Sequence, residues 1–196
     1  MRLASERIVP EMPSGSSPFA DGNNQESSSE AVSAWNGLAL WAKATGQRQL
    51  ETAATWMLSA EASSSLAYWT NFPLDDPLYD GFDHTVTSLV WGGKRDYATW
   101  FTAEPSAMLG ILVLPMSPVA HYLAAEPDRI RVNLQDSAPN GYDVMFGDFL
   151  LMYASLQSPA AARDALTRAQ QLPAQRIDDG NTRSYLYAFI LLQAHA

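Results

Sequence analysis

The sequence has 196 residues, of which 47% are hydrophobic and only 17% are charged. This composition is typical of one globular domain with a sizeable core, and it excludes an intrinsically disordered chain. A formal net charge of -9 argues against nucleic-acid binding, and the absence of cysteine excludes disulfides and thiolate chemistry. The first 20 residues lack the apolar core of a signal peptide. The sequence contains no run of about 18 apolar residues, so we predict no membrane partner.

Along the chain, the first 18 residues predict a loop or ragged terminus, because they hold three prolines and no apolar periodicity. From Ser27 apolar residues recur at helical spacing, and Gly46 is expected to end this helix. Its apolar positions are Ala31, Ala34, Trp35, Leu38 and Trp41. A second amphipathic run begins near Gln47 and fades by about Tyr68. Two helices joined by a glycine-containing turn predict an αα-hairpin.

The remainder of the chain predicts one loop, one short strand and a series of helices. Residues 70–83 are dense in proline, aspartate and glycine, which is typical of a loop, and the β-branched residues of 84–93 predict a strand. Helical segments are then predicted over 104–114, 118–124, 127–134, 143–156, 159–172 and 182–194. The sum is a mainly α fold of seven or eight helices in hairpin order, with small β additions and no fixed repeat.

The stretch DGNNQESSSEA (21–31) contains two glutamates four residues apart. Ser27 followed by Glu30 matches a capping box, in which the serine accepts a first-turn amide and the glutamate reaches back to the cap amide. An acidic side chain there also complements the helix dipole, by about 0.3–1 kcal/mol. This structural interpretation accounts for Glu30, but it leaves Glu26 and the polar run 23–25 unexplained.

The same two glutamates also allow a chemical interpretation. Neighbouring carboxylates repel each other, and a catalytic site can use this repulsion to split their pKa values between an acid and a base. Spacing alone favours the structural interpretation and leaves the chemical one open.

The segment WGGKRDYATWF (91–101) is the second unusual stretch. Its glycines allow a backbone to approach a ligand closely, and its aromatic rings offer stacking faces for flat ligands such as sugar rings. The alternative is an ordered loop packed over the helices. His84 lies near Asp80 and Asp83 but has no second histidine close to it in sequence. We therefore predict a structural or substrate-contacting histidine and no metal site.

Four stretches resemble, in the same order, segments of glycoside hydrolase family 81, the endo-β-1,3-glucanases. They are DGNNQESSSEA, WGGKRDYATWF, LPMSPVAHYL and IDDGNTRSYLY, and the resemblance runs from about Phe19 to the end of the chain. It implies an enzyme that hydrolyses internal β-1,3 bonds of laminarin-like glucans with inversion, and we expect no cofactor. It also implies that residues 19–196 are the C-terminal portion of a catalytic (α/α)6 toroid, preceded by a divergent segment 1–18.

The resemblance assigns roles to the two glutamates of the first motif. Glu26 is implied to be the general base that activates water, and Glu30 to be a second essential carboxylate that positions or tunes the first. The side chains that we predict to bind substrate are Asn24, Gln25, His84, Trp91, Lys94, Asp96, Tyr97 and Trp100.

The sequence departs from the family where the general acid is expected. In the family an aspartate, with a histidine shortly after it, lies just upstream of the first motif. Residues 1–13 contain neither, and their only acids are Glu6 and Glu11, to which we assign no role. We therefore expect impaired hydrolysis and an incomplete toroid with exposed apolar helix faces. Besides the glucan, the expected partner is the N-terminal part of the same enzyme, and we expect the full-length parent to be secreted.

Two other functions stay open from the sequence. One is a non-catalytic β-1,3-glucan-binding fragment that uses an aromatic groove without the acid. The other is a helical scaffold that has no ligand.

Overall fold

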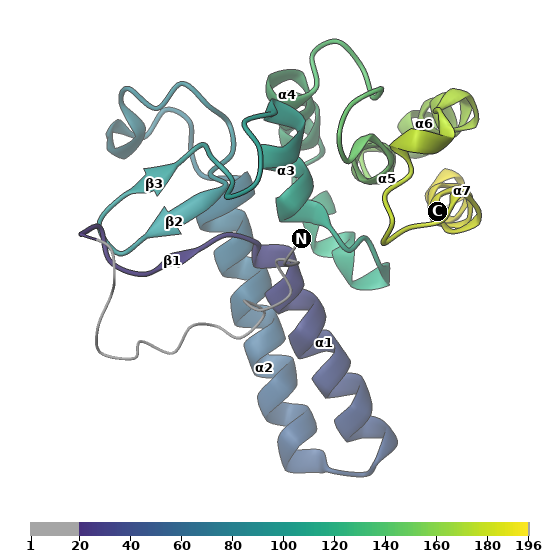
Figure 1. The fold of residues 1–196 in the computed structure, drawn as a ribbon. Coiled ribbons are helices and arrows are strands. Elements are labelled where there is room, and N and C mark those ends of the chain that lie inside the picture. Colours follow the sequence, from purple (N-terminus) through teal and green to yellow (C-terminus); the bar gives the residue numbers. More distant parts are fainter. Residues whose placement is uncertain (1–19, 196) are drawn as a thin grey trace.

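The structure is a computed structural model that describes residues 20–195, so the predictions for residues 1–18 lie outside the described residues. Helices predominate, and a small three-stranded sheet lies beside the open end of the first helical hairpin (Figure 1). The α-helices are α1 (Ser28–Ala44), α2 (Arg48–Ser65), α3 (Pro105–Val113), α4 (Pro127–Ser137), α5 (Gly147–Ser155), α6 (Pro159–Gln171) and α7 (Arg183–Ala194). The strands and shorter helices are β1 (Asn24–Gln25), β2 (Leu89–Trp91), β3 (Arg95–Asp96), η2 (Leu66–Thr70), η3 (Pro77–Tyr79), η4 (Pro118–Ala125) and η5 (Ala174–Arg176). The prediction of a mainly α fold with small β additions is confirmed.

Helices α1 and α2 form the predicted αα-hairpin, which projects from the rest of the described chain (Figure 1). The hydroxyl of Ser27 accepts the amide of Glu30 at 3.4 Å, so the serine cap of α1 is present. Gly46 has a φ of 71°, a left-handed conformation that glycine adopts without a Cβ penalty. Local signals in the sequence therefore set both the start of α1 and the turn into α2.

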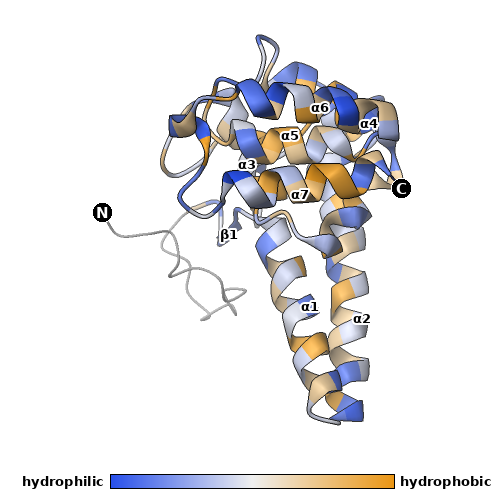
Figure 2. Ribbon diagram, turned by 90° about the vertical axis from the view of Figure 1, so that its right-hand side faces the viewer, coloured by the Kyte–Doolittle hydropathy of each residue, from blue (hydrophilic) through white to orange (hydrophobic). Residues whose placement is uncertain are grey.

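The hairpin buries small side chains and leaves large aromatic ones at its surface. The buried residues of α1 are Ser28, Ser29, Val32 and Ala42. By contrast, Trp41 of α1 and Trp56 of α2 are 53% and 68% exposed. Hydrophobic residues continue along the part of both helices that projects from the other helices (Figure 2). The apolar spacing thus identified the helix but not its buried face, because the far part of the hairpin lies away from the main core.

The main hydrophobic core lies around α3 and α5, which are buried along almost their whole length. Helices α4, α6 and α7 pack around this pair (Figure 2). Within the core, the amide of Asn133 donates to the buried hydroxyl of Tyr153 at 3.1 Å, which satisfies that polar group. In the described part of the chain, no single helix is long and apolar enough to cross a membrane, and α3 with η4 would be so only as a pair bent by 118°.

The helix predicted over 143–156 begins four residues later than expected. Phe146 has a φ of 58°, so helical dihedrals start only at Gly147. A Cβ atom on Gly147 would lie 1.9 Å from the carbonyl oxygen of Tyr142, and one on Gly110 would lie 2.5 Å from the ring of Phe146. The segment before α5 therefore packs too closely against α3 and α5 to be helical itself.

We expect Gly147→Ala and Gly37→Ala to change stability in opposite directions. The first places a methyl group against the Tyr142 backbone and should lower the free energy of unfolding by about 1–3 kcal/mol or more. The second lies in the middle of α1 with nothing within 4 Å of its added Cβ, and it should raise that free energy by about 0.5–1 kcal/mol. Urea unfolding followed by circular dichroism measures both. A tolerated Gly147→Ala would contradict the close packing described here.

Candidate active site

The pairing of β1 with β2 brings the two unusual stretches of the sequence together. In this antiparallel pair Asn24 lies opposite Trp91 and Gln25 opposite Val90. The polar run that the capping interpretation left unexplained is therefore the edge strand of the small sheet. The sequence analysis did not predict this strand, because two polar residues are too short to show a period of two.

Glycines from both stretches allow this pairing. Gly22 has a φ of 88°, and a Cβ atom on it would lie 3.3 Å from the Cα atom of Gly92. A Cβ atom on Gly92 would lie 3.3 Å from the carbonyl oxygen of Asp21. The glycines of the second stretch were predicted to permit close approach to a ligand. In the structure, Gly92 permits close approach to the backbone of the first stretch, and contact of these glycines with a ligand stays a prediction.

Trp100 binds two side chains of the first stretch. Its backbone amide donates to a carboxylate oxygen of Glu26 at 3.0 Å, and its indole Nε1–H donates to the amide oxygen of Asn24 at 3.2 Å. Alternate residues of an extended segment point to the same face, which explains why residues 24 and 26 share one partner. The Glu26 carboxylate is thus oriented beside an aromatic ring that is 46% exposed.

The predicted residues Trp91, Lys94 and Asp96 form a connected group next to Trp100. The indole of Trp91 donates to the Asp96 carboxylate at 2.8 Å, and the Lys94 ammonium lies 3.2 Å from that carboxylate and 3.2 Å from the one of Asp21. These two carboxylates raise the pKa of Lys94. The rings of Trp91 and Trp100 are 5.9 Å apart and tilted by 60°. The two indoles therefore stand together with charged hydrogen-bonding groups beside them, and the Lys94 ammonium lies over the Trp91 ring, 5.3 Å from its centroid.

Glu30 lies one turn into α1 and is half-buried. Burial raises the pKa of its carboxyl group, and a hydrogen bond with Ser27 opposes that rise. Glu30 and Glu26 thus have different environments, because Glu26 accepts a backbone amide at the end of a strand. Such a difference between two carboxylates is what a division of chemical roles requires.

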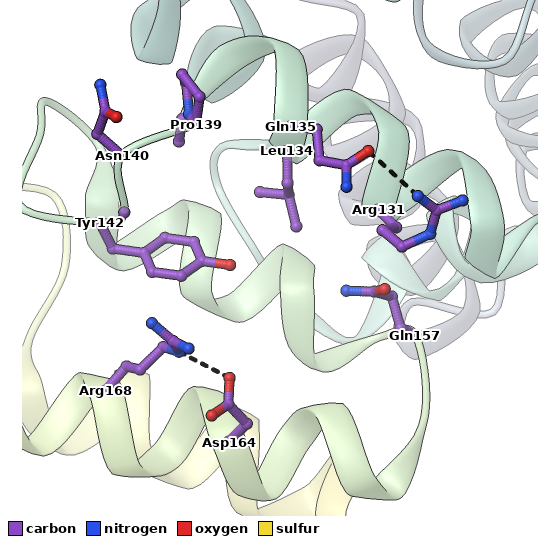
Figure 3. Close-up of a pocket in the computed structure, with 11 residues that line it drawn as sticks. Arg131, Leu134, Gln135, Pro139, Asn140, Tyr142, Gln157, Asp164 and Arg168 are labelled. Atoms are coloured by element: carbon purple, nitrogen blue, oxygen red, sulfur yellow. Dashed lines mark hydrogen bonds and ion pairs between the residues drawn. The ribbon is translucent and has the colours of Figure 1, made fainter.

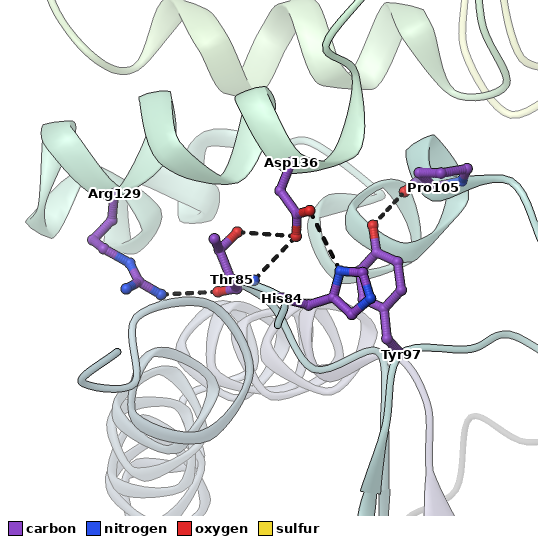
Figure 4. Close-up of polar contacts among 6 residues, drawn as sticks. All are labelled: His84, Thr85, Tyr97, Pro105, Arg129 and Asp136. Atoms are coloured by element: carbon purple, nitrogen blue, oxygen red, sulfur yellow. Dashed lines mark hydrogen bonds and ion pairs between the residues drawn. The ribbon is translucent and has the colours of Figure 1, made fainter. Parts of the chain in front are cut away.

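His84 and Tyr97 form a second group, which the sequence predicted only in part (Figure 4). Their rings stack with centroids 3.5 Å apart and planes 7° from parallel. Asp136 of α4 accepts the amide of Thr85 at 3.0 Å and lies 3.4 Å from the His84 Nδ1 atom. Burial raises the pKa of Tyr97 to about 12, and Asp136 adds to the rise. The sequence missed Asp136, because an aspartate in a polar helix turn carries no signal of its distant partner.

Glu61 of α2 is a third carboxylate near the first stretch, and the sequence analysis also missed it. The side-chain amide of Gln25 donates to Glu61 at 3.5 Å. Burial raises the pKa of Glu61, and the contact with Gln25 opposes that rise. One signal was available: Glu61 is the only charged residue between Glu51 and the end of η2.

A hollow of about 450 Å³ lies elsewhere, between α4, the loop that follows it and α6 (Figure 3). Its lining includes Tyr142, the hydrogen-bonded pair Arg131–Gln135 and the ion pair Asp164–Arg168. None of the predicted site residues lines it. Across residues 20–195, no group of three histidine, cysteine, aspartate or glutamate side chains could hold a metal ion.

Glycoside hydrolases generally use a pair of carboxylates, and here two glutamates of one motif lie on a helical scaffold that also carries two neighbouring tryptophans. The chain belongs to glycosyl hydrolase family 81, because the model of that family's C-terminal domain matches residues 12–187. The predicted family is therefore confirmed.

Individual relatives agree with this assignment. A glucan endo-1,3-beta-D-glucosidase of Acetivibrio thermocellus is 32% identical over 185 residues, which cover 90% of this chain and 22% of that protein. One of Thermobifida fusca is 27% identical over 179 residues, covering 90% and 23%. A mutant of a family 81 enzyme from Clostridium thermocellum has a solved structure that superposes with a TM-score of 0.73 at 30% identity, covering 88% of this chain and 24% of that one. The chain thus spans less than a quarter of each of these relatives.

We expect Glu30→Gln to change the pH dependence of stability. A carboxyl whose pKa is higher in the folded than in the unfolded chain contributes stability below its ordinary pKa of 4.5, and loses it as pH rises through the folded value. The neutral variant lacks this loss, so its free energy of unfolding relative to the wild type should rise between pH 4 and pH 7.

Urea unfolding at several pH values measures this difference, with Glu104→Gln at an exposed position as the control for the chemical change itself. A relative stability that falls with pH would show that the helix dipole outweighs burial at Glu30.

Proposed function

We propose that this chain is the part of a family 81 endo-β-1,3-glucanase that carries the general base and part of the glucan-binding surface. The observation that supports this most strongly is the junction of the two motifs: the amide of Trp100 orients the Glu26 carboxylate beside the Trp91–Trp100 pair. Family membership supplies the reaction class, and the names of the relatives point to β-1,3-glucan as the substrate.

In the proposed reaction, Glu26 takes a proton from a water molecule that attacks the anomeric carbon. A general acid protonates the leaving oxygen from the other face of the sugar, and the configuration inverts. The two carboxyl groups of an inverting glycosidase are about 6.5–9.5 Å apart, which leaves room for that water. We propose that the acid belongs to the part of the enzyme that the 196-residue stretch does not match.

The other site residues have roles that follow from their surroundings. Trp91 and Trp100 offer apolar faces to successive glucose rings, and Lys94 with Asp96 offers a donor and an acceptor to sugar hydroxyls at the edge of those faces. Glu30, half-buried four residues after Glu26, positions or tunes the base. Because glucan polymers do not cross membranes, we propose that the whole enzyme is exported.

His84 and Tyr97 complete the proposed binding surface. Tyr97 directly follows Asp96 in the chain, so the stacked ring pair continues from the end of β3. The Asp136 carboxylate beside His84 orients the imidazole for a hydroxyl contact. We therefore assign this pair to substrate binding rather than to proton transfer.

A second candidate is a non-catalytic β-1,3-glucan-binding unit. The exposed ring of Trp100 favours it, because such a ring binds sugar without needing an acid. Consider a joined enzyme in which this chain replaces the matching stretch of the Acetivibrio thermocellus relative. Retention of the chain on curdlan without release of soluble sugar, together with an inactive joined enzyme, would support this candidate.

We expect hydrolysis to depend on Glu26 and on the rest of the family 81 catalytic machinery. The chain alone should release reducing ends from laminarin about 10²–10⁴-fold more slowly than a joined enzyme, in which it replaces the matching stretch of the Acetivibrio thermocellus relative. Glu26→Gln in the joined enzyme should lower the rate by a similar factor, because the amide cannot accept the proton.

The control is Glu51→Gln, which makes the same change on the first turn of α2, and it should leave the rate unchanged. Rapid laminarin hydrolysis by the chain alone, or by the Glu26→Gln enzyme, would contradict the proposed division of roles.

We also expect the first product of the joined enzyme to be the α anomer. A water activated on the face opposite the leaving group inverts the β linkage in one displacement. Proton nuclear magnetic resonance (NMR) of the anomeric region, recorded within the first minutes of laminarin hydrolysis, distinguishes the two anomers before mutarotation. Initial formation of the β anomer would exclude the role given to Glu26 as a base.

A further inference from the structure

We propose that Glu61 is a positioning residue of this site, which holds strand β1 through Gln25 and thereby fixes the Glu26 carboxylate. The contacts that support this inference are independent of the reaction. Only the consequence for catalysis rests on the function proposed above.

Strand β1 is held from two sides. Asn24 and Glu26 both bind Trp100, whereas Gln25, between them, binds Glu61. Successive side chains of an extended strand point to opposite faces, so Trp100 and Glu61 hold opposite faces of the same short segment. This matters because β1 has only two residues and lies at the edge of the sheet, with β2 as its one neighbour. The ladder alone therefore fixes its orientation weakly.

Glu61 itself lies on a well-fixed part of α2. One turn further on, Ser65 is buried, and its hydroxyl lies 2.9 Å from that of Ser28 and 3.3 Å from that of Tyr122. Burial raises the pKa of Tyr122 to about 12, and the charge of Glu61 adds to that rise. The end of α2 is thus joined both to the start of α1 and to η4.

The same helix end therefore positions both glutamates of the motif. Glu26 is reached through Gln25, and Glu30 is reached through Ser28, the first residue of α1. Without the Glu61 carboxylate, the Gln25 amide loses its acceptor on the rigid hairpin. Strand β1 would then lose its contact with α2 and keep those on the side of β2 and Trp100. A shift of about 1 Å in a catalytic group can lower a rate by about 100-fold, so this anchor has a measurable consequence.

The first test uses the 196-residue chain and needs no activity. In a ¹H–¹⁵N NMR spectrum, the backbone amide and the indole N–H of Trp100 report the contacts with Glu26 and Asn24. Trp100→Phe assigns the indole peak by removing it, and triple-resonance spectra assign the backbone amide. We expect Glu61→Ala to move both peaks, Glu61→Gln to move them less, since its amide oxygen still accepts from Gln25, and Glu51→Ala on the same helix to leave them in place. Unmoved Trp100 peaks in Glu61→Ala would overturn the inference.

A swapped pair separates positioning from a general loss of stability. The double variant Gln25→Glu with Glu61→Gln restores an amide–carboxylate contact in the reversed order. We expect it to return the Trp100 peaks toward the wild-type positions, although Gln25→Glu alone, which places two carboxylates together, should displace them. If Glu61→Ala does not fold, this pair and Glu61→Gln still decide the question. A double variant no closer to the wild type than its single variants would refute the inference.

The second test uses the joined enzyme. Glu61→Ala should lower kcat about 10–100-fold and change KM much less, because it displaces the base rather than the sugar-binding rings. The swapped pair should recover part of that loss. Unchanged kcat in Glu61→Ala would overturn the catalytic part of the inference. An inactive wild-type joined enzyme would instead count against the proposed function, while the Trp100 spectra would still test the role of Glu61.

Discussion

The antiparallel contact between β1 and β2 is the interaction on which the candidate site depends. It joins a glutamate-bearing stretch to an aromatic stretch more than 60 residues away in sequence, with Gln25 opposite Val90. The approach is close: a Cβ atom on Gly22 would lie 3.3 Å from the Cα atom of Gly92, so even a methyl group there would press on the facing backbone. Once the two backbones pair, the amide of Trp100 reaches Glu26, and the Glu26 carboxylate lies next to a tryptophan pair whose rings are 5.9 Å apart. A bulky residue at either glycine would therefore move the Trp100 amide away from the Glu26 carboxylate.

Two chemically identical side chains acquire different properties from their places in this arrangement. Glu26 ends an extended segment and accepts a backbone amide, whereas Glu30 is half-buried on the first turn of a helix, where burial raises its pKa. The helix cap and a catalytic role for Glu30 are therefore compatible rather than competing interpretations. Ser27 caps α1 by accepting the backbone amide of Glu30, so the cap does not require the Glu30 carboxyl group.

The two ends of the projecting hairpin have different surroundings. Its helices bury serine, valine and alanine, while Trp41 and Trp56 remain exposed. This agrees with an array of αα-hairpins that matches only 24% of a solved family 81 enzyme. The end of the hairpin near the sheet is different, because Glu61 contacts Gln25 of β1 and Ser65 contacts Ser28 at the start of α1. The hairpin thus supports the site at one end and leaves an apolar surface at the other.

The sequence by itself determined most of the helices, the cap of α1 and its turn into α2, and the family. These depend on signals within a few residues, such as apolar spacing, proline at a helix start, Ser27 before α1 and Gly46 after it. Only the tertiary structure decided that residues 24 and 25 form a strand, which face of α1 is buried, and that Glu61 and Asp136 lie beside Gln25 and His84. Each of these depends on a partner distant in the chain. A two-residue strand forms, and a lone carboxylate acquires its hydrogen-bond partner, only when that distant segment packs against it.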